Sequence, residues 1–383
     1  MKHWGKALFG LVVTGLLLWW ALADVAFAEV WANIRRGNFW LLGASVFVAT
    51  FGFFIRALRW RVLLVPVKPD TKLRSRFASV SIGFMMNNVL PARVGEFARA
   101  YAFSRMEPVS APAALGSLVV ERLMDGIILL LFLVLPVLTP GFPAAGALTE
   151  GWGSALLRAG VLAVLAVLAV LIWLSVWPAP FVRTVERVAR FLPEAVARPL
   201  VDSLEAFLDS VAILRRPRLM VAGALWSLFF WTWHGLSFWL GMLAFGIDTG
   251  FVSAIFTEAV VGFGVAIPSA PGFFGTFHAA AKFALSDVYG VAEAEALAFA
   301  FGYHFGGWIP ITLIGLWYTW RLGLSVSEMG AAEERVEDAV EEQIGPTALA
   351  VAEGEQSEGV PAEAGGRGDS AGPSDPRDGA PGP

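Results

Sequence analysis

The chain has 383 residues, of which 57% are apolar and 16% charged, and its mean hydropathy is +0.65, so the composition excludes an ordinary soluble protein, which carries about 25% charged residues. The net charge of −4 combines an acidic end, residues 328–383 with 14 acidic and 3 basic side chains, and a basic body with 25 Lys/Arg and 18 Asp/Glu. The absence of cysteine excludes disulfides and cysteine nucleophiles, and four scattered histidines without an HExxH motif lead us to expect no metal and no cofactor.

Six apolar stretches have about the length of a membrane-spanning helix, which needs roughly 20 residues. They are residues 7–23, 39–57, 117–138, 154–177, 219–245 and 297–320. The first also fits a cleavable signal peptide, because Lys2 and Lys6 precede its apolar run and small residues follow it. We expect it to be retained as a signal anchor, since the other helices already insert the chain.

The positive charges predict how these spans are oriented, because cytoplasmic loops are enriched in Lys and Arg. Residues 56–105 hold ten Lys/Arg against two acidic residues, and residues 181–218 hold seven arginines. The remaining connections between spans hold two Lys/Arg and six acidic residues. We therefore expect an all-α polytopic protein of the cell (inner or plasma) membrane, with six spans and both termini in the cytoplasm.

Two further apolar segments, 77–104 and 251–288, are interrupted by proline and glycine and predict re-entrant helical hairpins that enter from opposite faces. Both follow the pattern F-x5-GF, then P-x3-G-x-F, starting at Phe77 and at Phe256. Such paired broken segments are typical of inverted repeats with a binding site between them, because irregular backbone at that depth needs protein or a watery cavity around it. The predicted breaks contain Pro91, Gly95, Pro268, Pro271, Gly272 and Gly275.

Two cytoplasmic pieces flank this transmembrane domain of residues 1–327. Residues 199–214 place their apolar side chains on one helical face and predict an interfacial helix lying on the bilayer. The tail from residue 328 begins as a short charged helix and has almost no large apolar residues, which is typical of disorder.

Charged side chains inside membrane segments cost at least ~2.5 kcal/mol each and are candidates for function. Arg93, Glu96 and Arg99 are spaced so that Glu96 can pair with either arginine, and Glu121 and Asp125 share a helical face at i, i+4. One interpretation is that these charges form internal ion pairs that fix broken helices. The other is that they line a polar groove in which arginines hold a lipid phosphate and acids tune or relay charge.

A helix beginning at Gly272 would also offer its free N–H groups to an anion. The second span ends with Arg56, Arg59 and Arg61, which we interpret as snorkelling anchors at the membrane interface. The candidate residues of the lipid path and head-group site are Asn87, Asn88, Arg93, Glu96, Arg99, Glu121, Arg122, Asp125, Glu258, Thr276 and His278.

Four runs of sequence, RALRWRVLL (56–64), NNVLPARVGEFARAY (87–101), VVERLMDG (119–126) and PSAPGFFGTFHAA (268–280), carry a family resemblance. The chain resembles, over about residues 5–322, the flippase-like membrane family named for the transmembrane region of lysylphosphatidylglycerol synthase. The resemblance implies a lipid-translocation fold with re-entrant helices, in which the motifs around Arg93 and Glu121 contribute to the polar path. The family's late motif usually ends in an acidic residue, whereas this chain has Phe273 and His278 there.

The favoured function is a translocator for an anionic or phosphate-headed lipid, which includes polyprenyl-linked lipids. No GxxxxGK[ST] motif supplies an ATP site, so transport would be passive or driven by an ion gradient, with Glu96, Asp125, Glu258 and His278 as candidate proton carriers. The alternatives are an integral-membrane lipid-phosphate transferase or phosphatase, and a non-transporting partner of a synthase or glycosyltransferase. We expect no enzyme activity, no nucleic-acid partner, a membrane lipid as substrate, and a separate synthase or glycosyltransferase as partner.

Overall fold

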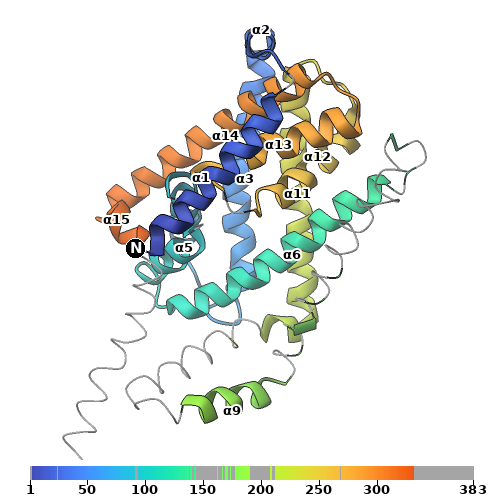
Figure 1. Cartoon of the computed structure of the whole chain (residues 1–383). Coiled ribbons are helices and arrows are strands. Elements are labelled where there is room, and N and C mark those ends of the chain that lie inside the picture. The colour runs from blue at the N-terminus through green and yellow to red at the C-terminus, as the bar shows by residue number, and fades with distance from the viewer. Residues whose placement is uncertain are drawn as a thin grey trace, which may run out of the picture.

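The computed structural model describes residues 2–23, 25–90, 94–137, 177–189, 212–267 and 269–331, with a few isolated positions between 139 and 208. The regular structure in these parts is helical, without a strand, and most of the helices gather into one bundle (Figure 1). The longer helices are α1 (Lys2–Leu22), α3 (Phe39–Leu64), α4 (Leu73–Val89), α6 (Ala111–Val137), α11 (Pro217–Ala244) and α14 (Glu293–Arg321). The shorter elements are α2 (Phe27–Arg36), α5 (Gly95–Ser104), α9 (Pro178–Ala189), η2 (Ala212–Arg215), α12 (Gly250–Gly264), η3 (Pro271–Phe273), α13 (Thr276–Lys282), η4 (Phe283–Val288) and α15 (Val326–Gly330).

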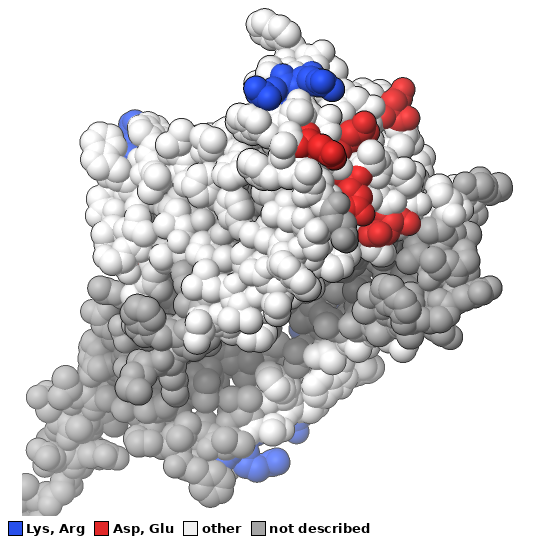
Figure 2. Space-filling view, turned by 45° about the horizontal axis from the view of Figure 1, so that its top comes forward, with Lys and Arg blue, Asp and Glu red and all other residues white. Residues whose placement is uncertain are grey.

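Three helices, α3, α11 and α14, are long and apolar enough to cross a membrane, and α1 with α2 adds a fourth candidate if this pair, bent by 81°, is one span. Large apolar side chains such as Phe47 on α3 and Leu313 on α14 are exposed. Figure 2 shows a face whose centre is almost free of charged side chains, while charged residues gather toward its ends. This pattern is that of a surface that faces lipid.

The described structure does not test all six predicted spans. Helix α6 has 27 residues, but Glu121, Arg122 and Asp125 near its middle set it apart from the three apolar helices. Most of segments 154–177 and 199–214, and the tail beyond residue 331, lie outside the described residues. The coarse class is confirmed, since the described chain is an all-helical bundle with three to four apolar candidate spans, and the count of six stays a prediction.

Helices α3 and α11 make the most extensive contact between two helices of the described chain. The Asn38 side chain caps α3 by accepting hydrogen bonds from the N–H groups of Trp40 and Leu41. Across the pair, Ser45 Oγ donates to the Ser237 carbonyl at 2.7 Å. The hydrogen bond between Ser45 and Ser237 helps to hold these two helices, which are far apart in the sequence, in a fixed register.

The first predicted hairpin is present as α4 and α5, which pack tightly against each other. A Cβ atom at Gly83 would lie 2.7 Å from the carbonyl oxygen of Gly95, so both helices need glycine where they cross. The Asn87 side chain closes the turn by accepting a hydrogen bond from the Gly95 N–H at 2.9 Å. Pro91 and Arg93, which the sequence places in the turn, lie outside the described residues.

The second predicted hairpin runs through α12, η3, α13 and η4. One expectation is wrong: the helix after the break begins at Thr276 rather than at Gly272. Gly272 and Gly275 have φ of +70° and +87°, so the chain turns in left-handed conformations that a helix does not allow. Pro268 lies outside the described residues, and Pro271 opens the short turn η3.

Both segments are broken by proline and glycine, but they differ in their contacts, so the inverted repeat also stays a prediction. Gly83 of the first hairpin packs on Gly95, whereas Gly262, its counterpart in the sequence pattern, packs on Leu129 of α6. In the second hairpin the close approach of the two arms falls instead at Gly264, where a Cβ would lie 2.7 Å from Ala280 Cβ.

Each hairpin is held by a helix from one end of the described chain. Thr14 of α1 donates from Oγ1 to the Phe274 carbonyl at 3.0 Å and accepts from the Ala270 N–H at 2.8 Å. At the first hairpin, α15 buries Met329, and Tyr101 Oη donates to Glu328 Oε1 at 3.0 Å. The terminal helices therefore stabilise the two broken segments.

The connections at one end of the bundle are joined by Glu107, which lies between α5 and α6. Its carboxylate accepts from Lys68 Nζ at 2.9 Å and from the Lys72 N–H at 3.2 Å. Burial alone would raise the pKa of Glu107, but hydrogen bonds from Lys68, Ser75 and Lys72 outweigh it and lower the pKa below its usual value.

Candidate functional site

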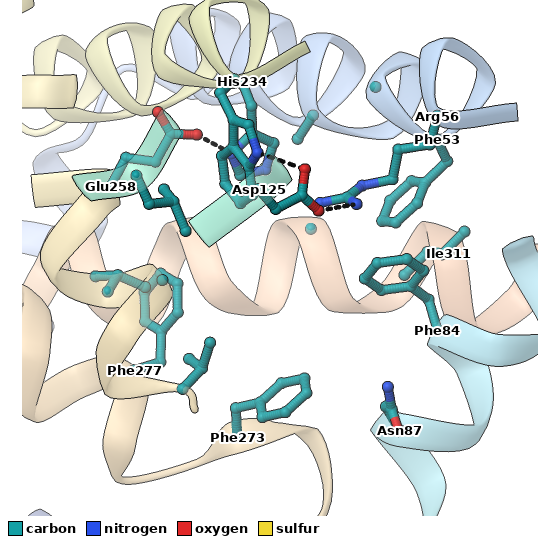
Figure 3. A pocket seen from close by; sticks show the side chains of 18 of the residues that line it. Phe53, Arg56, Phe84, Asn87, Asp125, His234, Glu258, Phe273, Phe277 and Ile311 are labelled. Carbon is teal, nitrogen blue, oxygen red and sulfur yellow. Dashed lines mark hydrogen bonds and ion pairs between the residues drawn. The ribbon is translucent and has the colours of Figure 1, made fainter. Parts of the chain in front are cut away.

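A cavity of about 410 Å³ lies at the centre of the bundle, where both hairpins meet α3, α6, α11 and α14. This volume falls within the range of ligand pockets. Most of the wall is apolar, and its aromatic rings include Phe84 of the first hairpin and Phe273 and Phe277 of the second. Glu258, His234, Asp125 and Arg56 lie next to one another along one side, and Asn87 lies apart from them (Figure 3). The polar lining residues are Arg56, Asn87, Asn88, Glu96, Arg122, Asp125, His234, Glu258, Tyr303 and His304.

One end of the polar wall belongs to a charged cluster of four arginines and two carboxylates, namely Arg56, Arg59, Arg99, Glu121, Arg122 and Asp125. Glu121 is fully buried at its centre. Arg99 binds both of its oxygens, at 2.9 and 3.0 Å, and Arg59 Nη2 and Arg122 Nη2 each lie 3.0 Å from Oε1. Such forked pairs are strong because two parallel charge-assisted hydrogen bonds form at once.

Asp125, one helical turn further along α6, completes the cluster. It is paired with Arg59, and it accepts a hydrogen bond from Trp231 Nε1 at 2.8 Å. Arg59 Nη1 also donates to Ser227 Oγ at 3.1 Å. The prediction that Glu121 and Asp125 share a helical face is thus confirmed. The partners of these two carboxylates on other helices come from α3, α5 and α11.

The cluster carries two more positive than negative charges, and the two arginines on the cavity wall are its most loosely bound members. Arg56 lies 3.4 Å from Asp125 and 3.5 Å from Glu121, and its guanidinium carbon sits 4.0 Å from the centre of the Phe230 ring. Arg122 keeps 41% of its side chain exposed. Both can therefore present N–H donors to an anion in the cavity while the buried pairs hold the cluster together.

The other end of the polar wall contains Glu258 and His234, which face each other from α12 and α11 (Figure 3). His234 Nδ1 lies 2.6 Å from Glu258 Oε1. Glu258 is 1% exposed, and its second oxygen, Oε2, has no hydrogen-bond partner within the described part of the chain. This carboxyl group therefore stands apart from the arginines that neutralise Glu121 and Asp125.

Six of the predicted site residues line the cavity: Asn87, Asn88, Glu96, Arg122, Asp125 and Glu258. Asn87 Nδ2 donates to Glu96 at 3.4 Å, and Asn88 Nδ2 donates to Thr312 Oγ1 at 2.8 Å. Of the two arginines that the sequence spacing offers to Glu96, Arg99 binds Glu121 instead, and Arg93 lies outside the described residues.

Four predicted residues lie behind the wall or outside it. Arg99 and Glu121 are buried in the charged cluster, and Thr276 Oγ1 donates to the Phe273 carbonyl at 3.0 Å, so it closes the turn. His278 is fully buried among aromatic rings, with the Phe301 ring centre 4.0 Å away. Arg93 lies outside the described residues.

The interpretation of Arg56 and Arg59 as snorkelling anchors is wrong. They are 5% and 0% exposed and bind the α6 carboxylates, whereas Arg61 is exposed as expected. Sequence reasoning also missed His234 and His304. The sequence did contain a pattern that could have predicted the pairing of these arginines. Arg56 and Arg59 share a helical face at i, i+3, a spacing that complements the i, i+4 carboxylate pair on α6.

The donor set of this cavity fits an anion rather than a metal. Arginine N–H groups and an asparagine amide are donors suited to phosphate oxygens. Among the residues that the structure describes, no group of three His, Asp or Glu side chains is placed to hold a metal ion.

Comparisons with known proteins find relatives of low sequence identity. The chain is 25% identical to Glycosyltransferase AglD of Haloferax volcanii over 357 residues, covering 86% of this chain and 56% of that protein. It is 23% identical to the UPF0104 membrane protein MJ1595 of Methanocaldococcus jannaschii over 174 residues, covering 43% of this chain and 49% of that protein. The matches thus span about half the length of each relative, and no solved structure matches the chain.

The family comparison covers most of the helical bundle described above. The sequence matches the family "Lysylphosphatidylglycerol synthase TM region" over residues 7–315, which include both hairpins, the charged cluster and every residue that lines the cavity. This chain therefore belongs to the lysylphosphatidylglycerol synthase transmembrane-region family of membrane proteins.

Proposed function

We propose that this protein is a lipid translocator that moves an anionic, phosphate-headed lipid between the two leaflets without ATP. The observation that carries the proposal is the cavity between two broken hairpins, whose polar wall ends in arginines with an excess of two positive charges. A phosphate head group would bind Arg56 and Arg122, and its negative charge would compensate the excess positive charge of the cluster. The aromatic part of the lining would accept the apolar portion next to the head group.

Transport would proceed by alternating exposure of this cavity, with each hairpin opening it toward one leaflet. The glycine crossing at Gly83 packs α4 closely onto α5, and the left-handed conformation at Gly272 breaks the second segment, so in this proposal each hairpin moves as a unit. We propose in addition that the protein lies in the cell membrane with both termini in the cytoplasm, and that it is not itself an enzyme. Its lipid would come from a separate synthase or glycosyltransferase.

Reconstitution into liposomes tests the proposal. Fluorescent phosphatidylglycerol and phosphatidylcholine would be followed by quenching of the outer-leaflet dye, and faster flipping of the anionic lipid than in empty liposomes is expected. A charge-assisted hydrogen bond is worth about 1.5–3 kcal/mol, so Arg56→Gln and Arg122→Gln should each slow this flipping roughly tenfold or more. The matched control is Arg61→Gln, which removes an exposed arginine at the end of the same helix α3.

Equal rates in protein-containing and empty liposomes for every lipid class would overturn the proposal. Wild-type rates in both cavity variants would show that lipid passes elsewhere.

The similarity to a protein named a glycosyltransferase, over 86% of this chain, favours a second candidate function, that of a membrane partner of such an enzyme. Detergent-solubilised membranes separate the two, because without a bilayer a translocator is dispensable and a partner is not. If extracts from cells lacking the protein transfer sugar to lipid as well as wild-type extracts do, the partner role is refuted.

A further inference from the structure

We propose that the Glu258–His234 pair is a proton-binding site, and that one proton crosses the membrane together with each anionic head group. This inference rests on the proposed translocator function and adds the driving ion. The acidic side chains near the cavity differ in the partners that surround them.

Two of the acids are already neutralised by fixed cations. Glu121 and Asp125 are bound by arginines, which stay charged at all relevant pH values. A carboxylate with such partners holds its negative charge permanently and is unsuited to carrying a proton back and forth. Glu96, half-buried, accepts a hydrogen bond from Asn87.

Glu258 differs because its partner is titratable. The contact of His234 Nδ1 with Oε1, at 2.6 Å, is the single ion-pair contact that Glu258 makes among the described residues. Oε2 is unpartnered there and lies against Gly235, where an added Cβ would come within 3.1 Å of it. A buried carboxylate with one unpaired oxygen is costly, and a proton on the pair removes that cost.

The charged groups around the pair explain why its proton should matter for an anion. Arg56 of α3 and Arg122 and Asp125 of α6 line the same cavity as members of the charged cluster, and Glu96 of α5 and Tyr303 and His304 of α14 also line it. Glu121 lies behind that wall. The elements α13 and η4, which also pack against α12, carry His278, Lys282 and Asp287, and Lys282 is paired with Glu293 at 2.8 Å.

Aromatic side chains connect the pair to the arginine end. The His234 ring stacks on Phe230 with 5.8 Å between ring centres, and the Arg56 guanidinium lies over the same Phe230 ring at 4.0 Å. Trp231, whose N–H binds Asp125, has its ring centre 5.9 Å from that of His234. A charge change at the pair is therefore felt at the anion site across one layer of rings.

The sign of the coupling follows from the charges. Uptake of one proton by the Glu258–His234 pair raises the charge of the cavity by one unit, either by neutralising Glu258 or by making His234 cationic. An anionic head group binds better to the more positive cavity, and by linkage the bound head group favours the proton equally. The proton and the head group are then released together on the other side, so a monoanionic lipid moves with one proton and without net charge.

The experiment uses the full-length protein in liposomes that hold a trace of fluorescent phosphatidylglycerol, with a pH difference of one unit and the membrane potential held at zero by valinomycin and equal potassium. With one proton moved per lipid, a tenfold ratio of proton concentrations across the membrane can sustain up to about a tenfold ratio of the lipid between the leaflets. The reason is that a tenfold concentration ratio stores the same free energy for the proton as for the lipid. We expect wild type to approach this ratio, with the lipid accumulating in the leaflet on the alkaline side.

Glu258→Gln keeps the size of the side chain and removes its titration, so it should bring the ratio back to one. His234→Gln should do the same and serves as the second variant if Glu258→Gln does not fold. Asp248→Asn is the matched control, because it removes an exposed acidic side chain that does not line the cavity, and it should behave as wild type.

Three results overturn the inference. Flipping without any pH-driven asymmetry in wild type would refute proton coupling and leave the translocator intact. A lipid ratio as large as that of wild type in both Glu258→Gln and His234→Gln would show that the proton does not bind at this pair. Absence of flipping in wild type, with or without the gradient, would refute the proposed function itself.

Discussion

Replacing Glu121 by glutamine removes one negative charge from the centre of the charged cluster and keeps the shape of the side chain. Four guanidinium groups then share the single carboxylate of Asp125. Arg99 loses the most, because both of its charge-assisted hydrogen bonds, at 2.9 and 3.0 Å, end on Glu121 and its side chain is 3% exposed.

The size of the effect follows from this geometry. Breaking a buried ion pair by removing one partner costs about 3–5 kcal/mol, because the other charge stays buried without compensation. Glu121→Gln leaves Arg99 in that state and weakens the pairing of Arg59, so we expect the upper part of this range. Arg122→Gln removes a partner that is 41% exposed, and an exposed pair is worth about 0–1 kcal/mol.

Thermal unfolding of detergent-purified protein, followed by tryptophan fluorescence, measures these differences, and the 16 tryptophans supply the signal. The order of stability should be wild type, then Arg122→Gln, then Glu121→Gln. The double variant Glu121→Gln with Arg99→Met should recover part of the loss, because it removes the stranded cation as well as the carboxylate. Glu29→Gln, at an exposed position of α2, is the control and should unfold as wild type does.

Equal unfolding temperatures for wild type and Glu121→Gln would refute the reasoning, because they would mean that the arginines are solvated in the native state. A double variant that loses the full sum of the two single losses would show that Arg99 and Glu121 do not interact.

Three further outcomes are expected from contacts outside the cluster. Gly83→Ala should destabilise the first hairpin by about 1–3 kcal/mol through overpacking, whereas Gly43→Ala, with open space around its Cβ, should not lower the unfolding temperature. Thr14→Val should speed amide exchange in the turn of the second hairpin, since it removes both hydrogen bonds of the side chain, and unchanged exchange would show that α1 does not hold that turn. Because the pKa of Glu107 is lower in the folded state, its ionised carboxylate stabilises the fold at pH values above the unfolded-state pKa of about 4.3. This contribution disappears as the pH falls through the lower folded-state pKa. Lys68→Gln should therefore lower the unfolding temperature at neutral pH and have little effect below that pH range.

Local sequence was sufficient for the broken hairpins and for the acidic face of α6. Proline and glycine in an apolar run end a helix through their own backbone properties, so the breaks can be located from neighbouring residues alone. Side chains at i and i+4 lie on the same helical face whatever surrounds the helix. For this reason Asn87, Glu96 and Asp125 were predicted as site residues and line the cavity.

Burial of the arginines could not be inferred in this way. Arg56 and Arg59 stand at the end of an apolar span, where a snorkelling arginine and a paired arginine leave the same local pattern. Only the packing of α3 against α6 decides between them, and it places both guanidinium groups on carboxylates more than 60 residues away in the chain.

Composition, hydropathy and short motifs are properties of neighbouring residues, and they were enough to identify a helical membrane protein of the lysylphosphatidylglycerol synthase transmembrane-region family. Which charges neutralise one another and which face the cavity became clear only from the packing of the helices. This packing paired His234 with Glu258, and it withdrew His278 into an aromatic core. These outcomes depend on distances between helices that are remote in sequence, and electrostatic pairing acts through space rather than along the chain.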